Sequence, residues 1–92
     1  MYIPLYSNKF KKSYNKLRKS KTISRVEVEV VVSMIAKGEI LPIKYRDHKL
    51  QGEQNDCREC HAKPNVLLVY KINKNNQLLD LLNIGSHSEL FG

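Results

Sequence analysis

Residues 66–85 read VLLVYKINKNNQLLDLLNIG and decide the fold, because they predict two antiparallel strands joined by a tight turn. Residues 66–72 form a short apolar run rich in β-branched and aromatic side chains, which is typical of a buried strand. The turn is predicted at 73–76, since Asn75 and Asn76 tolerate left-handed backbone angles. Residues 77–85 then form the returning strand.

Further strands are predicted outside this hairpin. Residues 57–62, CRECHA, lie just before Pro64 and predict a preceding strand of the same antiparallel meander. Residues 1–6, MYIPLY, can add an edge strand, the position in a sheet where Pro4 is tolerated. Residues 41–56 lack sustained periodicity and predict a long loop, and loops of that length are often functional.

The segment between the edge strand and the loop predicts two helices. The first covers residues 8–20, with Ser7 or Asn8 as its cap. Its inward face carries three residues at helical spacing, namely Phe10, Tyr14 and Leu17. The second segment, SRVEVEVVVSMIAKGE, alternates like a strand at its start, and valine prefers strands.

The end signals of this second segment favour a helix over residues 24–37. Ser24 followed by Glu27 is a capping box, Ile23 can pack on Val28, and Gly38 suits a left-handed residue after the last turn. The predicted inward face consists of Ile23, Val26, Val30 and Met34, widened by Val31 and Ile35.

Two helices followed by three strands predict one α+β domain over residues 1–92, with both N-terminal helices packed on one face of a small antiparallel sheet. No apolar run approaches the ~20 residues needed to span a bilayer, so we expect a soluble protein with no membrane partner. The start of the chain lacks the charge order and apolar length of a signal peptide, so we expect it in the cytoplasm.

Positive charge is concentrated near the N-terminus. The net charge is +7, and every charged residue before Glu27 is basic. These residues are Lys9, Lys11, Lys12, Lys16, Arg18, Lys19, Lys21 and Arg25. Such a segment suits a polyanion, whether nucleic acid, an acidic protein or an anionic membrane face, although a solvated helix face that only aids solubility is an equal alternative.

The motif CRECH at residues 57–61 has the spacing of haem attachment and of some metal sites. In a strand, however, side chains alternate, so Cys57 and Cys60 point to opposite faces and their thiolates cannot converge on one ion. The chain has no second cysteine pair. We therefore expect no metal, haem or other cofactor, and we place Cys60 in the core.

The same alternation puts Glu59 and His61 side by side on one face. A carboxylate beside an imidazole is either a surface hydrogen bond or an acid–base pair, and the residues alone leave both readings open.

Three separated blocks, YRDHKLQGE at 45–53, RECHAKPNVLLVYKI at 58–72 and IGSHSELFG at 84–92, resemble the YafQ-type branch of the RelE superfamily of bacterial toxins. The resemblance implies one RelE-like domain that cuts messenger RNA on the ribosome without a metal ion. It also implies neutralisation by a cognate antitoxin, in a toxin–antitoxin hetero-oligomer, with the antitoxin over the first helix or over the site.

The resemblance implies a site built on three histidines. His48, His61 and His87 match positions that the family uses at its active site, and histidine suits proton transfer near neutral pH. We expect His48 or His61 to take the proton of the attacking 2′-hydroxyl and His87 to protonate the leaving oxygen, which leaves a 2′,3′-cyclic phosphate. Glu59 is expected to orient His61.

Other matched positions are candidate substrate contacts. Phe91 matches a family aromatic that can stack on a base, or it packs over the core as a tail residue. The expected contacts to the phosphates are Arg46, Lys49, Arg58 and Lys63, although strand alternation turns Arg58 away from His61.

Two positions depart from the family pattern. Asn65, a further substrate-binding candidate, stands where relatives usually carry aspartate, and Asn83 stands where they usually carry arginine. Asparagine cannot act as a carboxylate base and brings no positive charge to the transition state. The alternative function is therefore a homologue that binds RNA, the ribosome or the antitoxin with weakened or lost cleavage.

Overall fold

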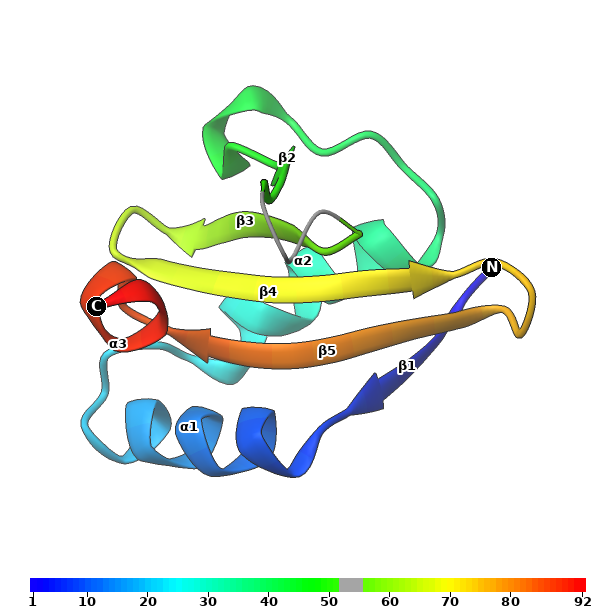
Figure 1. Ribbon diagram of the computed structural model, residues 1–92. Helices are drawn as coiled ribbons and strands as arrows, with labels where there is room; N and C mark the ends of the chain where they lie inside the picture. The colour runs from blue at the N-terminus through cyan, green and yellow to red at the C-terminus, as the bar shows by residue number, and fades with distance from the viewer. Residues whose placement is uncertain (52–55) are drawn as a thin grey trace.

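Two helices cover one side of a five-stranded sheet in an α+β fold (Figure 1). The computed structural model describes residues 1–51 and 56–92. Its elements in chain order are β1 (Ile3–Tyr6), α1 (Asn8–Lys19), α2 (Arg25–Ala36), η1 (Ile43–Tyr45), β2 (His48–Lys49), β3 (Arg58–Lys63), β4 (Val66–Asn73), β5 (Leu78–Gly85) and α3 (His87–Phe91). The predicted fold class, both long helices and the three-stranded meander are confirmed.

The strand order is β1-β5-β4-β3-β2. The strands β2 to β5 pair antiparallel, whereas the predicted edge strand β1 runs parallel to β5, so the sheet is mixed. The N–H groups of Ile3 and Ser7 donate to Gln77 and Leu81 at 2.9 and 3.0 Å. Pro4 lies between them at a position whose nitrogen faces outward, where no donor is needed.

The helix ends follow the local signals in the sequence. The hydroxyl of Ser7 accepts the N–H of Phe10 at 3.0 Å at the start of α1. The capping box of α2 is present, because Ser24 N–H donates to the Glu27 carboxylate at 2.9 Å and Glu27 N–H donates back to the Ser24 hydroxyl at 3.3 Å. Gly38 follows α2 with a φ of +76°, as its position predicted.

The predicted buried face of α2 is wrong in part. Val26 and Val30 are 66% and 46% exposed, while the residues buried on this helix are Val28, Val31, Val32, Ile35 and Ala36. The helix is apolar around most of its circumference, so several sets of residues are spaced to form one helical face. Contact with the sheet determines which of these faces is buried.

The connections differ from prediction in two places. In the β4–β5 turn the left-handed residue is Gln77, with a φ of +57°, and neither Asn75 nor Asn76 has a positive φ. The Asn73 side chain holds this turn by accepting Asn76 N–H at 3.2 Å. The predicted loop 41–56 contains η1 and β2, and β2 pairs with β3 as an outer strand. Residues 52–55 of that loop lie outside the described residues.

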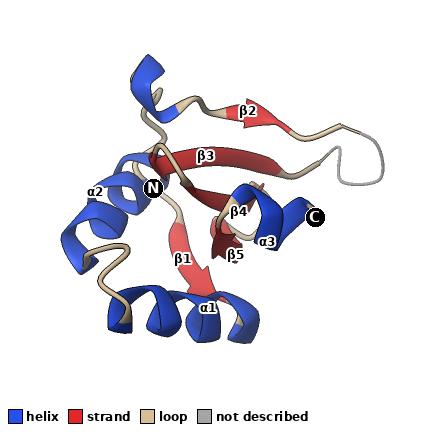
Figure 2. Cartoon of the chain, turned by 90° about the vertical axis from the view of Figure 1, so that its left-hand side faces the viewer, coloured by secondary structure: helices blue, strands red, loops and turns tan. Residues whose placement is uncertain are grey.

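The sheet has two distinct sides. Its near face packs against α1 and α2 around a buried cluster that includes Phe10, Val31, Cys60, Leu68 and Leu79. Its far face carries Glu59, Val69 and Asn83, and Figure 2 shows α3 on the opposite side of the sheet from α2. A Cβ on Gly85 would lie 3.3 Å from the Glu89 carboxylate, so the absent side chain lets α3 approach the end of β5 closely.

Candidate active site

Register brings residues that are distant in the chain into rows across the far face. One row runs through His48, Glu59, Val69 and Asn83, on β2, β3, β4 and β5. The next row runs through His61, Leu67 and Gly85. Neighbouring strands lie about 4.8 Å apart, so the backbones of His61 and Gly85 are separated by about 10 Å. His87 begins α3 two residues after Gly85.

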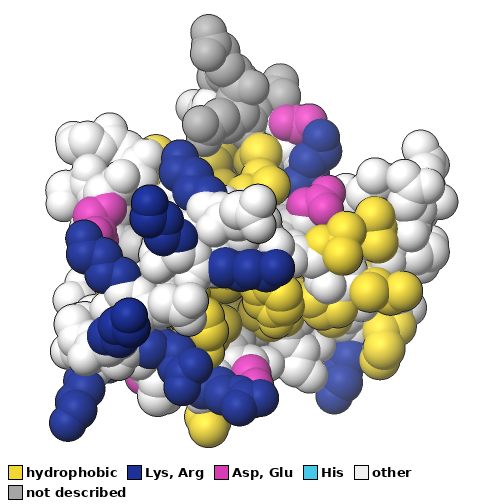
Figure 3. Space-filling view, turned by 90° about the horizontal axis from the view of Figure 1, so that it is seen from below, with side chains coloured by type: hydrophobic (Ala, Val, Ile, Leu, Met, Phe, Trp, Pro, Cys, Tyr) yellow, Lys and Arg dark blue, Asp and Glu magenta, His cyan; other side chains and the backbone are white. Residues whose placement is uncertain are grey.

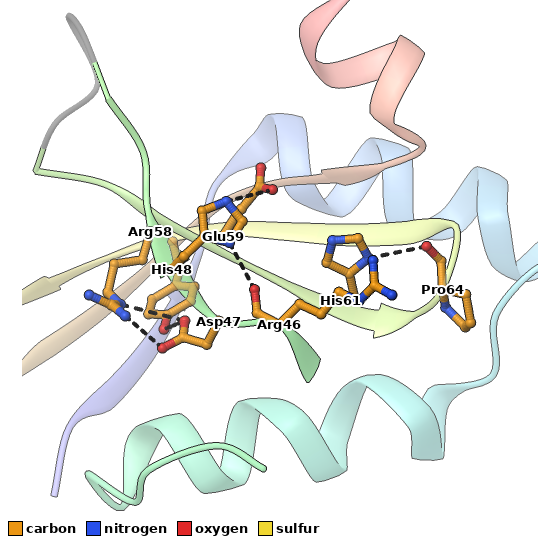
Figure 4. Close-up of polar contacts among 8 residues, drawn as sticks. Arg46, Asp47, His48, Arg58, Glu59, His61 and Pro64 are labelled. Atoms are coloured by element: carbon orange, nitrogen blue, oxygen red, sulfur yellow. Dashed lines mark hydrogen bonds and ion pairs between the residues drawn. The ribbon is translucent and has the colours of Figure 1, made fainter. Parts of the chain in front are cut away.

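The His48 ring is held between two oxygen acceptors (Figure 4). Its Nδ1 lies 2.8 Å from the carbonyl oxygen of Arg46, and its Nε2 lies 3.1 Å from Oε1 of Glu59. Both ring nitrogens therefore face an oxygen atom. Glu59 is 6% exposed, and the His48 ring lies against its carboxylate at 3.1 Å.

This pairing corrects the expected role of Glu59. The carboxylate contacts His48 and not His61, although Glu59 and His61 share a face as predicted. Sequence alternation shows only neighbours along one strand, and the partner of Glu59 comes from β2, across the sheet.

His61 has a different hydrogen-bond pattern. Its Nδ1 lies 3.1 Å from the carbonyl oxygen of Pro64, so that nitrogen carries the proton. In the neutral ring Nε2 is then a free acceptor and a base. His61 lies beside a bulge in β3, on the wall of a groove of about 400 Å³ between β3, α2 and η1. The other residues that line this groove are Val26, Glu27, Val30, Lys44, Tyr45, Ala62, Lys63 and Pro64.

His87 and Phe91 form an aromatic pair one turn apart on α3. Their ring centroids are 5.3 Å apart, and Phe91 is 39% exposed. A capping box fixes this short helix, since Ser86 N–H donates to the Glu89 carboxylate at 2.8 Å and Glu89 N–H donates to the Ser86 hydroxyl at 3.2 Å. These hydrogen bonds lower the pKa of Glu89.

Phe91 borders a hollow of about 280 Å³ beside α3. The hollow is lined by Lys9, Cys57, Val69, Leu82, Asn83, Leu90 and Phe91. The amide oxygen of Asn83 accepts the N–H of Ile84 at 2.9 Å. A flat aromatic ring beside a hollow with both polar and apolar walls is suited to contact with a nucleobase.

The basic and amide candidates fall into two groups. Arg46, Lys49 and Asn65 are exposed, and Arg46 has a left-handed backbone with a φ of +49°. Lys63 is tied to the start of α2, because its ammonium lies 3.5 Å from the Glu27 carboxylate and donates to the Thr22 carbonyl at 3.2 Å. No pattern in the sequence predicts this anchoring.

Arg58 belongs to a network on the near face that the sequence did not predict. Its Nη2 donates to Oδ2 of Asp47 at 2.8 Å, and the Tyr70 hydroxyl donates to the same carboxylate. The expected direction of Arg58, away from the face of His61, is thus observed. The sequence offers one indication of this network, which is that Asp47 directly precedes His48.

The two cysteines lie on opposite sides of the sheet. Cys60 is fully buried in the core, where burial raises its thiol pKa to about 12. Cys57 lines the hollow beside α3, and partial burial raises its pKa as well. Within residues 1–51 and 56–92, no group of three or more His, Cys, Asp or Glu side chains is arranged to hold a metal ion.

The basic residues near the N-terminus are exposed, and Figure 3 shows Lys and Arg side chains gathered on the surface seen from the α1 side. Lys9 belongs to this basic surface and also lines the hollow beside α3. Across the described part of the chain, no helix is long and apolar enough to cross a membrane.

Comparisons with known proteins agree on one family. The family described as "Bacterial toxin of type II toxin-antitoxin system, YafQ" matches residues 2–92. The chain is 30% identical over 88 residues to the mRNA interferase toxin YafQ of Escherichia coli strain B / BL21-DE3, covering 95% of this chain and 92% of that protein. The match to the strain K12 protein is 40% identical over 52 residues and spans 54% of that relative and 56% of this chain.

Solved structures share the whole fold. A metal-bound toxin from Helicobacter pylori is 43% identical, with a TM-score of 0.92 over 99% of this chain and 100% of that one. The YafQ chain of the E. coli DinJ-YafQ complex is 28% identical, with a TM-score of 0.86 over the full length of both chains.

Proposed function

The chain belongs to the YafQ family of bacterial toxins of type II toxin-antitoxin systems, and we propose that it cleaves messenger RNA on the ribosome by attack of the 2′-hydroxyl, without a metal ion. The observation that supports this proposal is the set of groups along β2, β3 and α3. These are the His61 ring with Nδ1 on a carbonyl oxygen, the His48 ring beside a carboxylate, and the aromatic pair on α3 next to a hollow.

His61 is the general base of the proposed reaction. Its Nδ1 proton is committed to the Pro64 carbonyl, so the neutral ring presents Nε2 to the 2′-hydroxyl. The 2′-oxygen then attacks the adjacent phosphorus, and the bond to the 5′-oxygen of the next nucleotide breaks. A positioned general base contributes typically about 10²- to 10⁴-fold in rate.

His48 has a supporting role instead of acting as the base. Its Nε2 lies 3.1 Å from Oε1 of Glu59, so this nitrogen is not available to the 2′-hydroxyl. The contact with Glu59 orients the ring, which can then hydrogen-bond the phosphate. His48 shares a register row with Asn83 but lies three strands away, about 14 Å, so it does not replace a charge at Asn83.

His87 protonates the leaving 5′-oxygen, and Phe91 stacks on a base next to the cut. His87 is exposed at the start of α3, and Phe91 holds its ring from the next turn. Stacking of a base on an aromatic side chain contributes about 1 to 3 kcal/mol. Arg46 and Lys49, which are both exposed, contact the phosphates on either side of the cleaved bond.

The partners follow from the family and from charge. YafQ of E. coli forms a complex with DinJ, and we expect a cognate antitoxin to bind this chain in a hetero-oligomer in the cytoplasm, where ribosomes are present. The basic surface of α1 suits either ribosomal RNA or an acidic antitoxin segment.

The test is cleavage of a translated message by the purified chain. Ends of the message are mapped by primer extension with ribosomes, without ribosomes and with excess chelator. We expect cuts with ribosomes, unaffected by chelator, and loss of cuts in His61→Ala and His87→Ala. Asn75→Ala, in the exposed β4–β5 turn, is the control that should cut normally. Full cleavage by a variant that lacks all three histidines would disprove the mechanism.

A second candidate function is binding without efficient cleavage. Asn83 favours it, since its amide oxygen accepts the N–H of Ile84 and its side chain brings no cation to the site. This alternative predicts ribosome, RNA or antitoxin binding with no new message ends. Binding through phosphate contacts should weaken with salt by roughly one unit of log–log slope per contact.

A further inference from the structure

The segment Arg46–Lys49 lies beside the edge of β3, and its side chains contact β3 on both faces of the sheet (Figure 4). On the far side His48 contacts Glu59 at 3.1 Å. On the near side the preceding residue, Asp47, contacts Arg58, which precedes Glu59. Two consecutive residues of the segment therefore pair with two consecutive residues of β3.

The near-side contact is a charged network. Asp47 accepts from Nη2 of Arg58 at 2.8 Å and from Nε of Arg58 at 3.5 Å, and it also accepts from the Tyr70 hydroxyl. Bidentate Arg–carboxylate pairs are stronger and more directional than neutral hydrogen bonds. Burial and the neighbouring Asp47 raise the pKa of Tyr70, so its hydroxyl remains a donor. Tyr70 is 2% exposed, which gives the network a rigid base.

The segment needs such an anchor because its own pairing is short. β2 contains only two residues, and a ladder of that length specifies its register weakly. A slip of one residue would turn His48 to the near face, since side chains alternate along a strand. Arg46 precedes the network in a left-handed conformation, with its carbonyl oxygen on Nδ1 of His48.

We propose that Asp47, clamped by Arg58 and Tyr70, is the positioning residue that fixes the register of β2 and so holds the His48 imidazole against Glu59. Asp47 touches no reacting atom in this scheme. Asp47 acts through the backbone of His48. The inference rests on the proposed function and gives the network on the near face a role in it.

The clamp is tested with Asp47→Asn and Tyr70→Phe, which keep the side-chain shapes. Imidazole nitrogen NMR reports the protons on each histidine ring. In the native chain the His48 Nε2 signal should differ from that of a free ring because of its contact with Glu59. In Asp47→Asn its signals should move toward those of a free ring, while the signals of His61 and His87 stay unchanged. Tyr70→Phe should give a smaller shift in the same direction, and Glu29→Gln, an exposed carboxylate on α2 that pairs with Arg25, should give none.

Cleavage kinetics give the second readout. Misplacing a reacting group by about 1 Å can cost on the order of 10²-fold, so kcat should fall by that order in Asp47→Asn while KM stays near the native value. The double variant Asp47→Asn/His48→Ala should be no slower than His48→Ala, because the clamp acts only through His48. Native His48 signals in Asp47→Asn, or fully additive rate losses, would overturn the proposal. If the native chain does not cleave RNA, the NMR comparison still decides whether the clamp exists.

Discussion

Removal of His48 should destabilise the folded protein through the carboxylate it leaves behind. Glu59 is 6% exposed and its side chain meets the His48 ring at 3.1 Å. Breaking a fully buried ion pair costs about 3 to 5 kcal/mol. The His48 side chain is 52% exposed, so water can enter its place in His48→Ala and solvate Glu59. The expected loss is therefore near the cost of an unsatisfied polar group, about 1 to 2 kcal/mol.

The assay is urea unfolding followed by circular dichroism, supported by thermal melts. A loss of 1 kcal/mol lowers Tm by about 4 to 8 °C in a chain of this size. Glu59→Gln removes the charge and keeps the volume, so His48→Ala/Glu59→Gln should be more stable than the sum of the two single changes predicts. His61→Ala is the matched control, because its ring contacts the Pro64 carbonyl and not Glu59.

The free energies of unfolding of the four chains form a double-mutant cycle. Coupling of about 1 kcal/mol between His48 and Glu59 is the expected result. A second cycle with His61→Ala in place of His48→Ala should show none. If the two changes at His48 and Glu59 add within about 0.5 kcal/mol, the pair does not exist in solution. Coupling to His61 instead would restore the pairing suggested by strand alternation alone.

Three further predictions test other parts of the account. Ser24→Ala removes the cap of α2 and should lower the free energy of unfolding by about 1 kcal/mol in urea titrations, and an unchanged midpoint would show that the capping box does not stabilise the helix. Burial raises the pKa of both thiols, so at mildly alkaline pH only a small fraction of each is thiolate. Mass spectrometry after alkylation should show slow labelling of Cys57 and labelling of Cys60 only on unfolding. Fast labelling of Cys60 in the folded chain would contradict its position in the core. Asn83→Arg restores a cation to the far face and should raise the RNA cleavage rate by on the order of tenfold or more, whereas a slower variant would show that no charge is missing there.

The parts of the fold that the sequence predicts are those with strong local signals. The capping box at Ser24, the glycine after α2 and the apolar runs of the hairpin each depend on residues close together in the chain. These signals overruled the strand-like alternation of valines at the start of α2. The resemblance to a toxin family added the three histidine positions, which no periodicity could have selected.

The remaining features depend on contacts between distant segments. The buried stripe of α2 could not be chosen from a helix that is apolar on most sides, so Val26 was placed inside although it is 66% exposed. β2 carries His48 into the sheet, yet its two residues give no strand pattern. The partner of Glu59 and the network around Asp47 both follow from that unpredicted strand pairing.

Attack by the 2′-hydroxyl is tested by replacing that one group in the substrate. A message is prepared with a single 2′-deoxynucleotide at its mapped cleavage site and is offered to the purified chain on translating ribosomes. Because the attacking oxygen is absent, we predict no cut at that site, while the unmodified message is cut and ends in a 2′,3′-cyclic phosphate. Equal cleavage of the two messages would contradict 2′-hydroxyl attack and the catalytic role assigned to His61.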